Sequence, residues 1–133
     1  MQILVTGGLG YIGSHTTVEL LQKGYDVVIV DDLSNSKLNV FDKIKKITGK
    51  NPKLEIIDLK DKIEVEKLFR NFNFDGIIHF AAHKSVNESV NFPEKYFKNN
   101  IVALENLLEI IDEEMYFISV SYTHLTLPTN SRV

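Results

Sequence analysis

The chain of 133 residues has the length of one modest domain and is short for a complete two-domain enzyme. Its apolar content of 44%, charged content of 25% and formal net charge of -3 are ordinary globular values and give no indication of a nucleic-acid-binding or membrane-binding surface. The absence of cysteine excludes disulfides and thiolate metal sites. We see no signal peptide ahead of the first apolar segment, and no apolar run approaches the roughly 18 residues of a membrane span. We therefore expect a cytoplasmic protein.

The first apolar segment leads directly into a cluster of glycines. Residues 3–5 are Ile, Leu and Val without interruption, which is typical of a strand buried on both faces of a parallel sheet. This strand is predicted to end at Thr6. The glycines that follow allow a tight turn in which no Cβ blocks a phosphate or the packing of the next helix; they are Gly7, Gly8, Gly10 and Gly13.

A helix is predicted from Tyr11 to a cap at Gly24, with an apolar face of Ile12, Val18, Leu20 and Leu21. Its first N–H groups and partial positive charge would suit a pyrophosphate. A second strand over residues 27–30 ends in Asp31, close to the spacing of about 20 residues after the glycines at which an acid binds the adenosine ribose. A glycine-rich turn that binds nothing is the alternative. A phosphate-binding P-loop fits less well, because Ser14-His15 stands where Lys-Ser/Thr is needed.

The polar segment after Asp31 is predicted to leave the carboxyl edge of the sheet, where ligands bind in open α/β folds. Asp31 and Asp32 favour a free ribose diol, because two carboxylates would repel a 2′-phosphate and no arginine is near. This pattern predicts NAD rather than NADP. Taken singly, the residues of this segment are equally compatible with a solvated turn.

Residues 40–48 are predicted to form a short amphipathic helix that Gly49 ends, and residues 54–57 a third strand. Asp58 and Leu59 follow at the carboxyl edge, from which a side chain can reach an adenine ring. Asp58 is explained equally well as the N-cap of a helix over residues 60–72.

A fourth strand is predicted over residues 76–82, where small residues would let the backbone pass close to a flat ligand. His79 is interpreted as a histidine satisfied within the strand; no HExxH or similar spacing is present, and no metal site is predicted. Lys84 follows on the ligand side. It is a candidate contact for the cofactor or an anionic substrate, although most surface lysines are merely solvated.

A long helix is predicted over residues 94–111 and a fifth strand over residues 115–118. Because asparagine is mildly unfavourable within a helix, a hydrogen-bonding task is expected for Asn99 or Asn100, with a solvent-facing asparagine as the alternative. The apolar face of this helix is predicted to comprise Tyr96, Phe97, Ile101, Leu104, Leu107, Leu108 and Ile111. From residue 120 on, helical periodicity is lost. Three residues there are not interpreted as catalytic, because a short segment offers no scaffold for a base: Ser121, Tyr122 and His124.

The residues at 5–15, Val-Thr-Gly-Gly-Leu-Gly-Tyr-Ile-Gly-Ser-His, resemble the cofactor fingerprint of extended short-chain dehydrogenase/reductases. Segments 31–36 and 80–90, with Pro93, Tyr96 and Asn99-Asn100, narrow the resemblance to the UDP-glucose 4-epimerase family over about residues 1–119. The discriminating feature is Lys84 followed by Glu-Ser-Val at 88–90, since related sugar-nucleotide dehydratases carry a different pattern there. Asp32 in place of a usual asparagine, and Ala-Leu at 103–104 in place of Gly-Thr, are departures that leave the assignment unchanged.

The alternation of strands and helices predicts an α/β fold, a truncated Rossmann-type doubly wound parallel sheet of about five strands in the order 3-2-1-4-5. The resemblance implies NAD as cofactor, a UDP-sugar as substrate of the complete enzyme, hydride removal and return at sugar C4, and a homodimer. It implies that the pyrophosphate is held by Gly7, Gly10, Tyr11, Ile12 and Gly13, the adenosine ribose by Asp31, Asp32, Leu33, Ser34, Asn35 and Ser36, the adenine by Asp58 and Leu59, and the rest of the dinucleotide by Phe80, Ala81, Ala82, Lys84 and Asn99.

The family continues with a catalytic Ser or Thr, a Tyr-x-x-x-Lys pair and a sugar-nucleotide domain. None of the tyrosines here has a lysine four residues further on. We therefore expect residues 1–119 to form an incomplete NAD-binding domain that is inactive by itself, and residues 120–133 to be a non-native or disordered tail. Another sugar-nucleotide enzyme, such as a dehydratase or decarboxylase, and a non-catalytic dinucleotide sensor are the alternatives.

Overall fold

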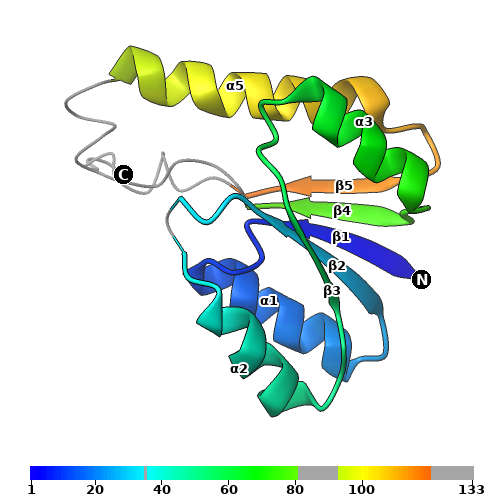
Figure 1. Ribbon diagram of the computed structural model, residues 1–133. Helices are drawn as coiled ribbons and strands as arrows, with labels where there is room; N and C mark the ends of the chain where they lie inside the picture. The colour runs from blue at the N-terminus through cyan, green and yellow to red at the C-terminus, as the bar shows by residue number, and fades with distance from the viewer. Residues whose placement is uncertain (35, 81–92, 121–133) are drawn as a thin grey trace, which may run out of the picture.

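The computed structural model describes residues 1–34, 36–80 and 93–120. These residues form a five-stranded parallel sheet in the order β3-β2-β1-β4-β5, which confirms the predicted class and strand order. Helices α1 and α2 cover one face of the sheet, and α3 and α5 cover the other (Figure 1). The elements are β1 (Gln2–Thr6), α1 (Tyr11–Gln22), β2 (Asp26–Asp31), α2 (Asn39–Thr48), β3 (Lys53–Ile56), α3 (Lys62–Asn71), β4 (Gly76–His79), α5 (Pro93–Ile110) and β5 (Tyr116–Ser119).

The central strand β1 determines where a ligand can enter the fold. Thr6, its last residue, pairs with Val30 of β2 on one side and with His79 of β4 on the other, so the three strands end together. The chain proceeds outward from β1 to β2 and β3, and then returns through α3 to β4. The strand order therefore reverses between β1 and β4, and open α/β sheets bind ligands beyond the carboxyl ends of the strands at such a point.

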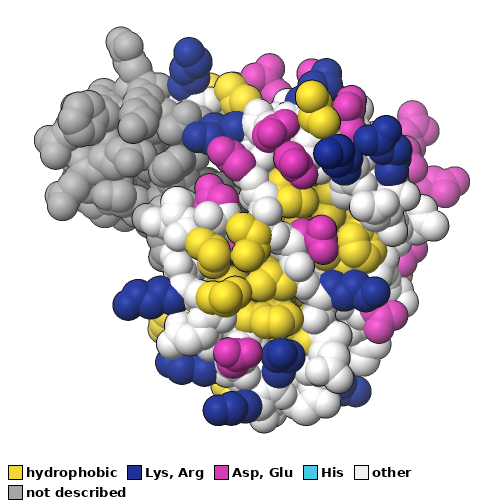
Figure 2. Space-filling model, in the orientation of Figure 1, with side chains coloured by type: hydrophobic (Ala, Val, Ile, Leu, Met, Phe, Trp, Pro, Cys, Tyr) yellow, Lys and Arg dark blue, Asp and Glu magenta, His cyan; other side chains and the backbone are white. Residues whose placement is uncertain are grey.

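Hydrophobic side chains gather on the face that carries β3 at the open edge of the sheet (Figure 2). Exposed apolar residues within the described ranges include Ile47 of α2, Ile56 of β3 and Ile63 of α3. None of the helices within the described ranges has the length and hydropathy needed to cross a membrane.

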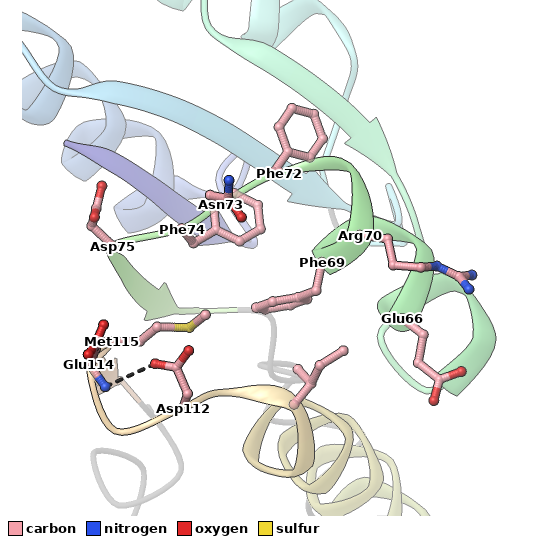
Figure 3. Close-up of a pocket in the computed structure, with 11 residues that line it drawn as sticks. Glu66, Phe69, Arg70, Phe72, Asn73, Phe74, Asp75, Asp112, Glu114 and Met115 are labelled. Atoms are coloured by element: carbon pink, nitrogen blue, oxygen red, sulfur yellow. Dashed lines mark hydrogen bonds between the residues drawn. The ribbon is translucent and has the colours of Figure 1, made fainter.

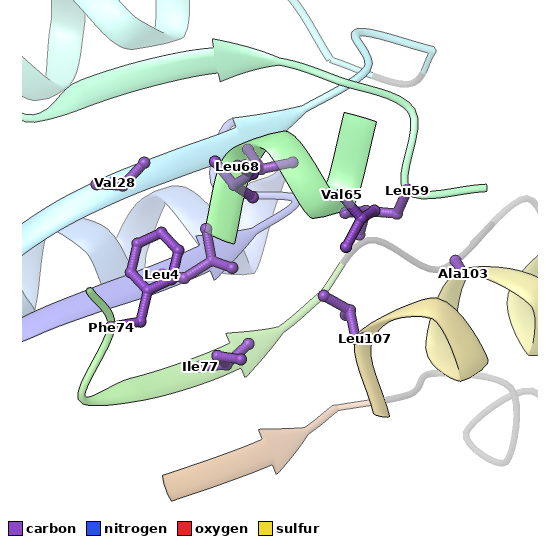
Figure 4. Packing of buried hydrophobic residues seen from close by; sticks show 10 residues of the cluster. Leu4, Val28, Leu59, Val65, Leu68, Phe74, Ile77, Ala103 and Leu107 are labelled. Atoms are coloured by element: carbon purple, nitrogen blue, oxygen red, sulfur yellow. The ribbon is translucent and has the colours of Figure 1, made fainter. Parts of the chain in front are cut away.

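Two hydrophobic cores lie on opposite faces of the sheet, because successive side chains of a strand alternate between faces. Leu4 of β1 is fully buried and packs with Val28 and Ile77 beneath α3 and α5 (Figure 4). Ile3 and Val5 belong to the second core, on the side of α1 and α2. Burial of one such side chain contributes about 1.5–3 kcal/mol. The uninterrupted apolar run of β1 thus reflects a strand covered on both faces.

Glycines end two helices in the left-handed conformation, as the sequence predicts. Gly24 follows α1 with a φ of 93°, and its N–H donates to the Leu21 carbonyl at 3.1 Å. Gly49 ends α2 with a φ of 68°, and its N–H donates to the Lys45 carbonyl at 2.8 Å. Both positions favour glycine because other residues are strained at positive φ.

The start of α3 excludes one of the two alternatives for Asp58, the one in which it is the N-cap of the helix. The N-cap is Asp61, whose Oδ1 accepts two backbone N–H groups of the first helical turn at 3.1 and 3.3 Å. Asp58 instead accepts the Lys60 N–H at 2.9 Å in the turn before the helix. Two aspartates three residues apart both satisfy a capping pattern, and packing of the helix on the core decides between them.

The buried side of α5 is narrower than predicted. Ala103 and Leu107 are buried, whereas Ile101 and Leu108, both predicted on the apolar face, are 51% and 49% exposed. The helix packs on α3 and on the core along one side only, so these two side chains face away from it. The remaining boundaries differ from the predicted ones by one or two residues, except at the end of β4. That strand is predicted to reach residue 82 but ends at His79; Phe80 follows it outside the strand, and residues 81–82 lie outside the described ranges.

Candidate functional site

The glycines of the turn between β1 and α1 stand where a side chain would clash with neighbouring atoms or strain the backbone. Gly7 has a φ of 66°, and its N–H donates to the Val30 carbonyl at 2.6 Å, which anchors the turn to β2. A Cβ on Gly8 would lie 2.6 Å from Cγ2 of Ile29, and a Cβ on Gly13 would collide with the Gly7 carbonyl oxygen. The glycines are therefore required by backbone conformation at one position and by close packing at two others.

The N-terminus of α1 presents backbone donors beside this turn. Gly10 is the N-cap residue, it provides no side-chain hydrogen bond, and the first turn contains no acidic residue. Tyr11 is 81% exposed, and Ile12 is also exposed, which corrects its predicted place on the apolar face. The buried residues of α1 are Gly13, Thr17 and Leu21. Unpaired N–H groups and the helix dipole suit this end of α1 to an anion.

Asp31 joins the glycine turn to the loop after β2. Its Oδ2 accepts the Leu9 N–H at 3.1 Å, and its Oδ1 accepts the Leu33 N–H at 2.8 Å and the Ser36 hydroxyl at 2.7 Å. The Asp31 residue is only 6% exposed. A carboxylate has about four acceptor positions, so these three donors leave one position for a ribose hydroxyl. A second ribose hydroxyl could take the place of the Ser36 hydroxyl, because both are O–H donors.

The loop after Asp31 has a defined local structure. Leu33 has a φ of 64°, a conformation that is rare outside glycine, and its N–H is held by Asp31. Oδ1 of Asp32 accepts both the N–H and the hydroxyl of Ser34, at 3.0 and 2.8 Å. These contacts place two carboxylates in sequence at the carboxyl edge of β2, as the sequence predicts.

Asp58 and Leu59 lie beyond the carboxyl end of β3. Asp58 is half exposed, and its Oδ2 makes a loose ion pair with Lys60 at 3.9 Å. Leu59 is buried in the core below α3 and α5. The side chain available to a ligand here is therefore that of Asp58, while Leu59 could contribute its backbone.

Thr6 and His79 join the ends of β1 and β4. Oγ1 of Thr6 lies 2.6 Å from Nδ1 of His79 and accepts the Phe80 N–H at 3.0 Å. All three residues are buried. The interpretation of His79 as a satisfied histidine is confirmed. The Phe80 side chain packs in the core on the side of α1 and α2, so its contribution to a cofactor site would come from the backbone.

Asn35, Ala81, Ala82 and Lys84 lie outside the described residues, as does the side chain of Asn99 in α5.

Sequence reasoning missed Thr6, Leu9 and Asn106 as residues that shape this edge of the sheet. A hydroxyl at the end of a buried strand is a usable signal for Thr6. Leu9 acts through its backbone N–H, a group that nearly every residue type has, so its identity as leucine does not indicate this role. Asn106, whose Nδ2 donates to the Leu59 carbonyl at 2.8 Å, resembles any other asparagine in a helix.

A cavity of about 750 Å³ lies at the opposite edge of the sheet (Figure 3). Asp75, one of its lining residues, immediately precedes β4, and its N–H donates to the Gln2 carbonyl at the start of β1. Phe69, Phe72 and Phe74 line it from α3 and the segment that follows. This cavity is thus separated from the glycine turn by the length of the strands, and it is not the candidate cofactor site.

The reversal of strand order beside β1, the glycine turn and the acid ending β2 define a Rossmann-type α/β domain. The family model described as GDP-mannose 4,6 dehydratase matches residues 4–124, and the chain belongs to this family of extended short-chain dehydrogenase/reductases.

Curated and solved relatives agree with this assignment. The chain is 53% identical over 107 residues to UDP-glucose 4-epimerase uge1 of Schizosaccharomyces pombe, a match that covers 80% of this chain and 30% of the relative. A UDP-glucose 4-epimerase structure from Stenotrophomonas maltophila, with bound NAD and formylated UDP-arabinopyranose, superimposes with a TM-score of 0.78 at 47% identity, covering 82% of this chain and 32% of that one. The enzyme from Bifidobacterium longum, in complex with NAD+ and UDP, gives a TM-score of 0.83 at 38% identity, covering 93% and 39%. The chain thus spans about a third of the length of these relatives.

Proposed function

We propose that this chain is the NAD-binding part of a UDP-glucose/UDP-galactose 4-epimerase. The observation that carries the proposal is the Asp31 carboxylate, which is bonded to the glycine turn at Leu9 and stands beside the uncapped start of α1. The start of α1 suits a diphosphate, and the Asp31 carboxylate suits a ribose diol. A dinucleotide carries these two chemical groups joined to each other in the same order. Relatives of known structure were crystallised with NAD, which supports the choice of cofactor.

The residues proposed to hold NAD follow the course of the cofactor across the carboxyl edge. We assign the pyrophosphate to Gly7, Gly10, Tyr11, Ile12 and Gly13, the adenosine ribose to residues 31–36, the adenine to Asp58 and Leu59, and the remainder to Phe80, Ala81, Ala82, Lys84 and Asn99. The collision of a Cβ at Gly13 with the Gly7 carbonyl supports the assignment of the pyrophosphate, because such close packing brings the start of α1 against the glycine turn.

The chain's own contribution to the reaction would be binding and orientation. When bound, NAD supplies a nicotinamide that takes up a hydride from C4 of the sugar and returns it. Asp31 and the α1 N-terminus would fix the adenosine half of the cofactor, and the crevice between β1 and β4 would direct the other half toward the substrate. Because no tyrosine of this chain has a lysine four residues on, we expect the 133-residue chain to show no turnover.

A dehydratase acting on a nucleotide sugar is the second candidate, because the matching family model carries a dehydratase description. The two reactions begin with the same cofactor, so NAD binding does not separate them. The gene sequence beyond codon 119 does: an acidic pair beside the catalytic threonine would favour the dehydratase.

A homodimer of the complete, cytoplasmic enzyme is part of the proposal. The exposed Ile101 and Leu108 lie seven residues apart on α5, a spacing that puts both on one face of the helix, and this supports a helix-mediated contact between subunits.

Titration of the 133-residue chain with NAD and NADP, followed by NMR, tests the proposed cofactor. We expect weak but saturable binding of NAD by this incomplete domain, and binding of NADP that is weaker still by at least about tenfold, because Asp31 and Asp32 oppose a 2′-phosphate. Equal affinity, or no saturation with either dinucleotide up to about 10 mM, would contradict the proposal.

A further inference from the structure

The Asn106 side chain of α5 reaches the turn after β3. Nδ2 of Asn106 donates to the Leu59 carbonyl at 2.8 Å, and Asn106 is partly buried. The Leu59 side chain packs in the same core as Ala103 and Leu107 of α5 (Figure 4). The turn is therefore held from α5 both by apolar packing and by one directed hydrogen bond.

The peptide unit between Leu59 and Lys60 is bonded at both ends. Its carbonyl accepts from Asn106, and its N–H donates to Oδ1 of Asp58 at 2.9 Å. Because a peptide unit is planar, the bond from Asn106 fixes the direction in which the Lys60 N–H points. That N–H in turn holds the Asp58 carboxylate. Asn106 is thus connected to Asp58 through one rigid group.

We propose that Asn106 is a positioning residue for recognition of the adenine ring. Through the Leu59–Lys60 peptide it orients the Asp58 carboxylate, which accepts the exocyclic amino group of adenine, and it fixes Leu59, whose backbone N–H lies beside that carboxylate in the chain. This inference rests on the proposed function, because it assumes that NAD binds along this edge.

A purely structural role is the competing explanation, since α5 is also tied to α3 next to this point. Nζ of Lys62 lies 2.7 Å from Oε2 of Glu109, one helical turn beyond Asn106. Glu109→Gln is therefore a matched control: it weakens a link between the same two helices without touching the Leu59–Lys60 peptide.

The test compares NAD with nicotinamide hypoxanthine dinucleotide, in which a carbonyl replaces the adenine amino group. We expect the 133-residue chain to prefer NAD by about tenfold, because the analogue presents an acceptor to the Asp58 carboxylate. Asn106→Leu and the isosteric Asn106→Asp should reduce this preference to less than about threefold, while Glu109→Gln should leave it unchanged. If the Asn106 variants bind both dinucleotides more weakly at an unchanged ratio, the role is structural and the inference is overturned.

Amide hydrogen exchange provides a second readout that needs no cofactor. In Asn106→Asp the Lys60 amide should exchange at least about fivefold faster, with Ile63 in the first turn of α3 as the internal reference. Equal protection of the Lys60 amide in both proteins would overturn the inference. Failure of the unaltered chain to bind NAD would overturn the proposed function and the inference with it, whereas binding with an unchanged ratio in the variants overturns the inference alone.

Discussion

The Asp31 carboxylate accepts the Leu9 backbone N–H at 3.1 Å, and this bond joins the last residue of β2 to the glycine turn. It brings a negative charge close to the turn that leads into α1, and it does so with the carboxylate almost fully buried. A site for a dinucleotide needs both features, a donor-rich place for phosphate and an acceptor for a sugar diol.

Replacement of Asp31 by asparagine should weaken NAD binding by about tenfold or more, because hydrogen bonds to charged groups are worth about 1.5–3 kcal/mol. Asparagine keeps one acceptor oxygen but loses the charge and the second acceptor. Calorimetric titration measures the change. Asp32→Asn is the matched comparison, since its neighbour Ser34 can still donate to an amide oxygen. That variant should lose less NAD affinity than Asp31→Asn does and should bind NADP better than the unaltered chain does.

Gly13→Ala should lower both stability and NAD affinity, because a Cβ there would meet the Gly7 carbonyl oxygen, and overpacking costs about 1–3 kcal/mol. Gly24→Ala provides a comparison of similar cost, about 1–2 kcal/mol from its positive φ, in open space at the other end of α1. Urea unfolding should show that the free energy of unfolding falls by a similar amount in both variants. Only the Gly13 variant should lose NAD binding beyond what its unfolded fraction explains.

The roles of the glycines at the helix ends could be predicted from the sequence, because a left-handed backbone conformation favours glycine over other residues. Gly24 and Gly49 adopt left-handed conformations at helix ends. The alternation of apolar strands and amphipathic helices predicted the parallel sheet, and the glycine fingerprint of dinucleotide-binding folds predicted its strand order. Sequence patterns did not distinguish Asp61 from Asp58 as the cap of α3, because both aspartates precede a helical pattern and only packing of the helix on the core selects its first residue.

Two further features could not be predicted for a different reason. The buried stripe of α5 depends on where α3 and the sheet contact it, so exposed Ile101 and Leu108 are indistinguishable in sequence from buried Leu107. The bond from Asn106 to Leu59 joins residues far apart in the chain, and residue type alone indicates neither partner.

Thr6→Val should destabilise the fold by about 1–3 kcal/mol, since it removes the hydroxyl that accepts the Phe80 N–H and pairs with the buried His79. Thr6→Ser keeps the hydroxyl and should recover most of this loss. The free energy of unfolding in urea distinguishes them. A serine variant that is less stable than the valine variant would show that the methyl group, and not the hydroxyl, matters at this position.

The ion pair between Lys62 and Glu109 predicts a dependence of stability on pH at the alkaline end. The hydrogen bond and the charge of Glu109 raise the pKa of Lys62 above its ordinary value of 10.5. The stabilisation is therefore fully present below pH 10.5 and is lost as the pH rises through the higher folded-state pKa. Both side chains are exposed, so the effect should be small and should weaken with added salt. In Glu109→Gln, the urea midpoint should lose this part of its pH dependence.

The proposed function requires NAD to lie across the glycine turn with its adenosine ribose on Asp31. Residue-resolved NMR of the 133-residue chain during titration with NAD tests it most directly. We predict saturable shifts of the backbone amides of Leu9, Gly10 and Leu33, together with intermolecular contacts between ribose protons and the segment at residues 31–34. Shifts confined to the cavity lined by Phe69, Phe72 and Phe74, or no saturable change at the glycine turn, would rule out this placement of NAD.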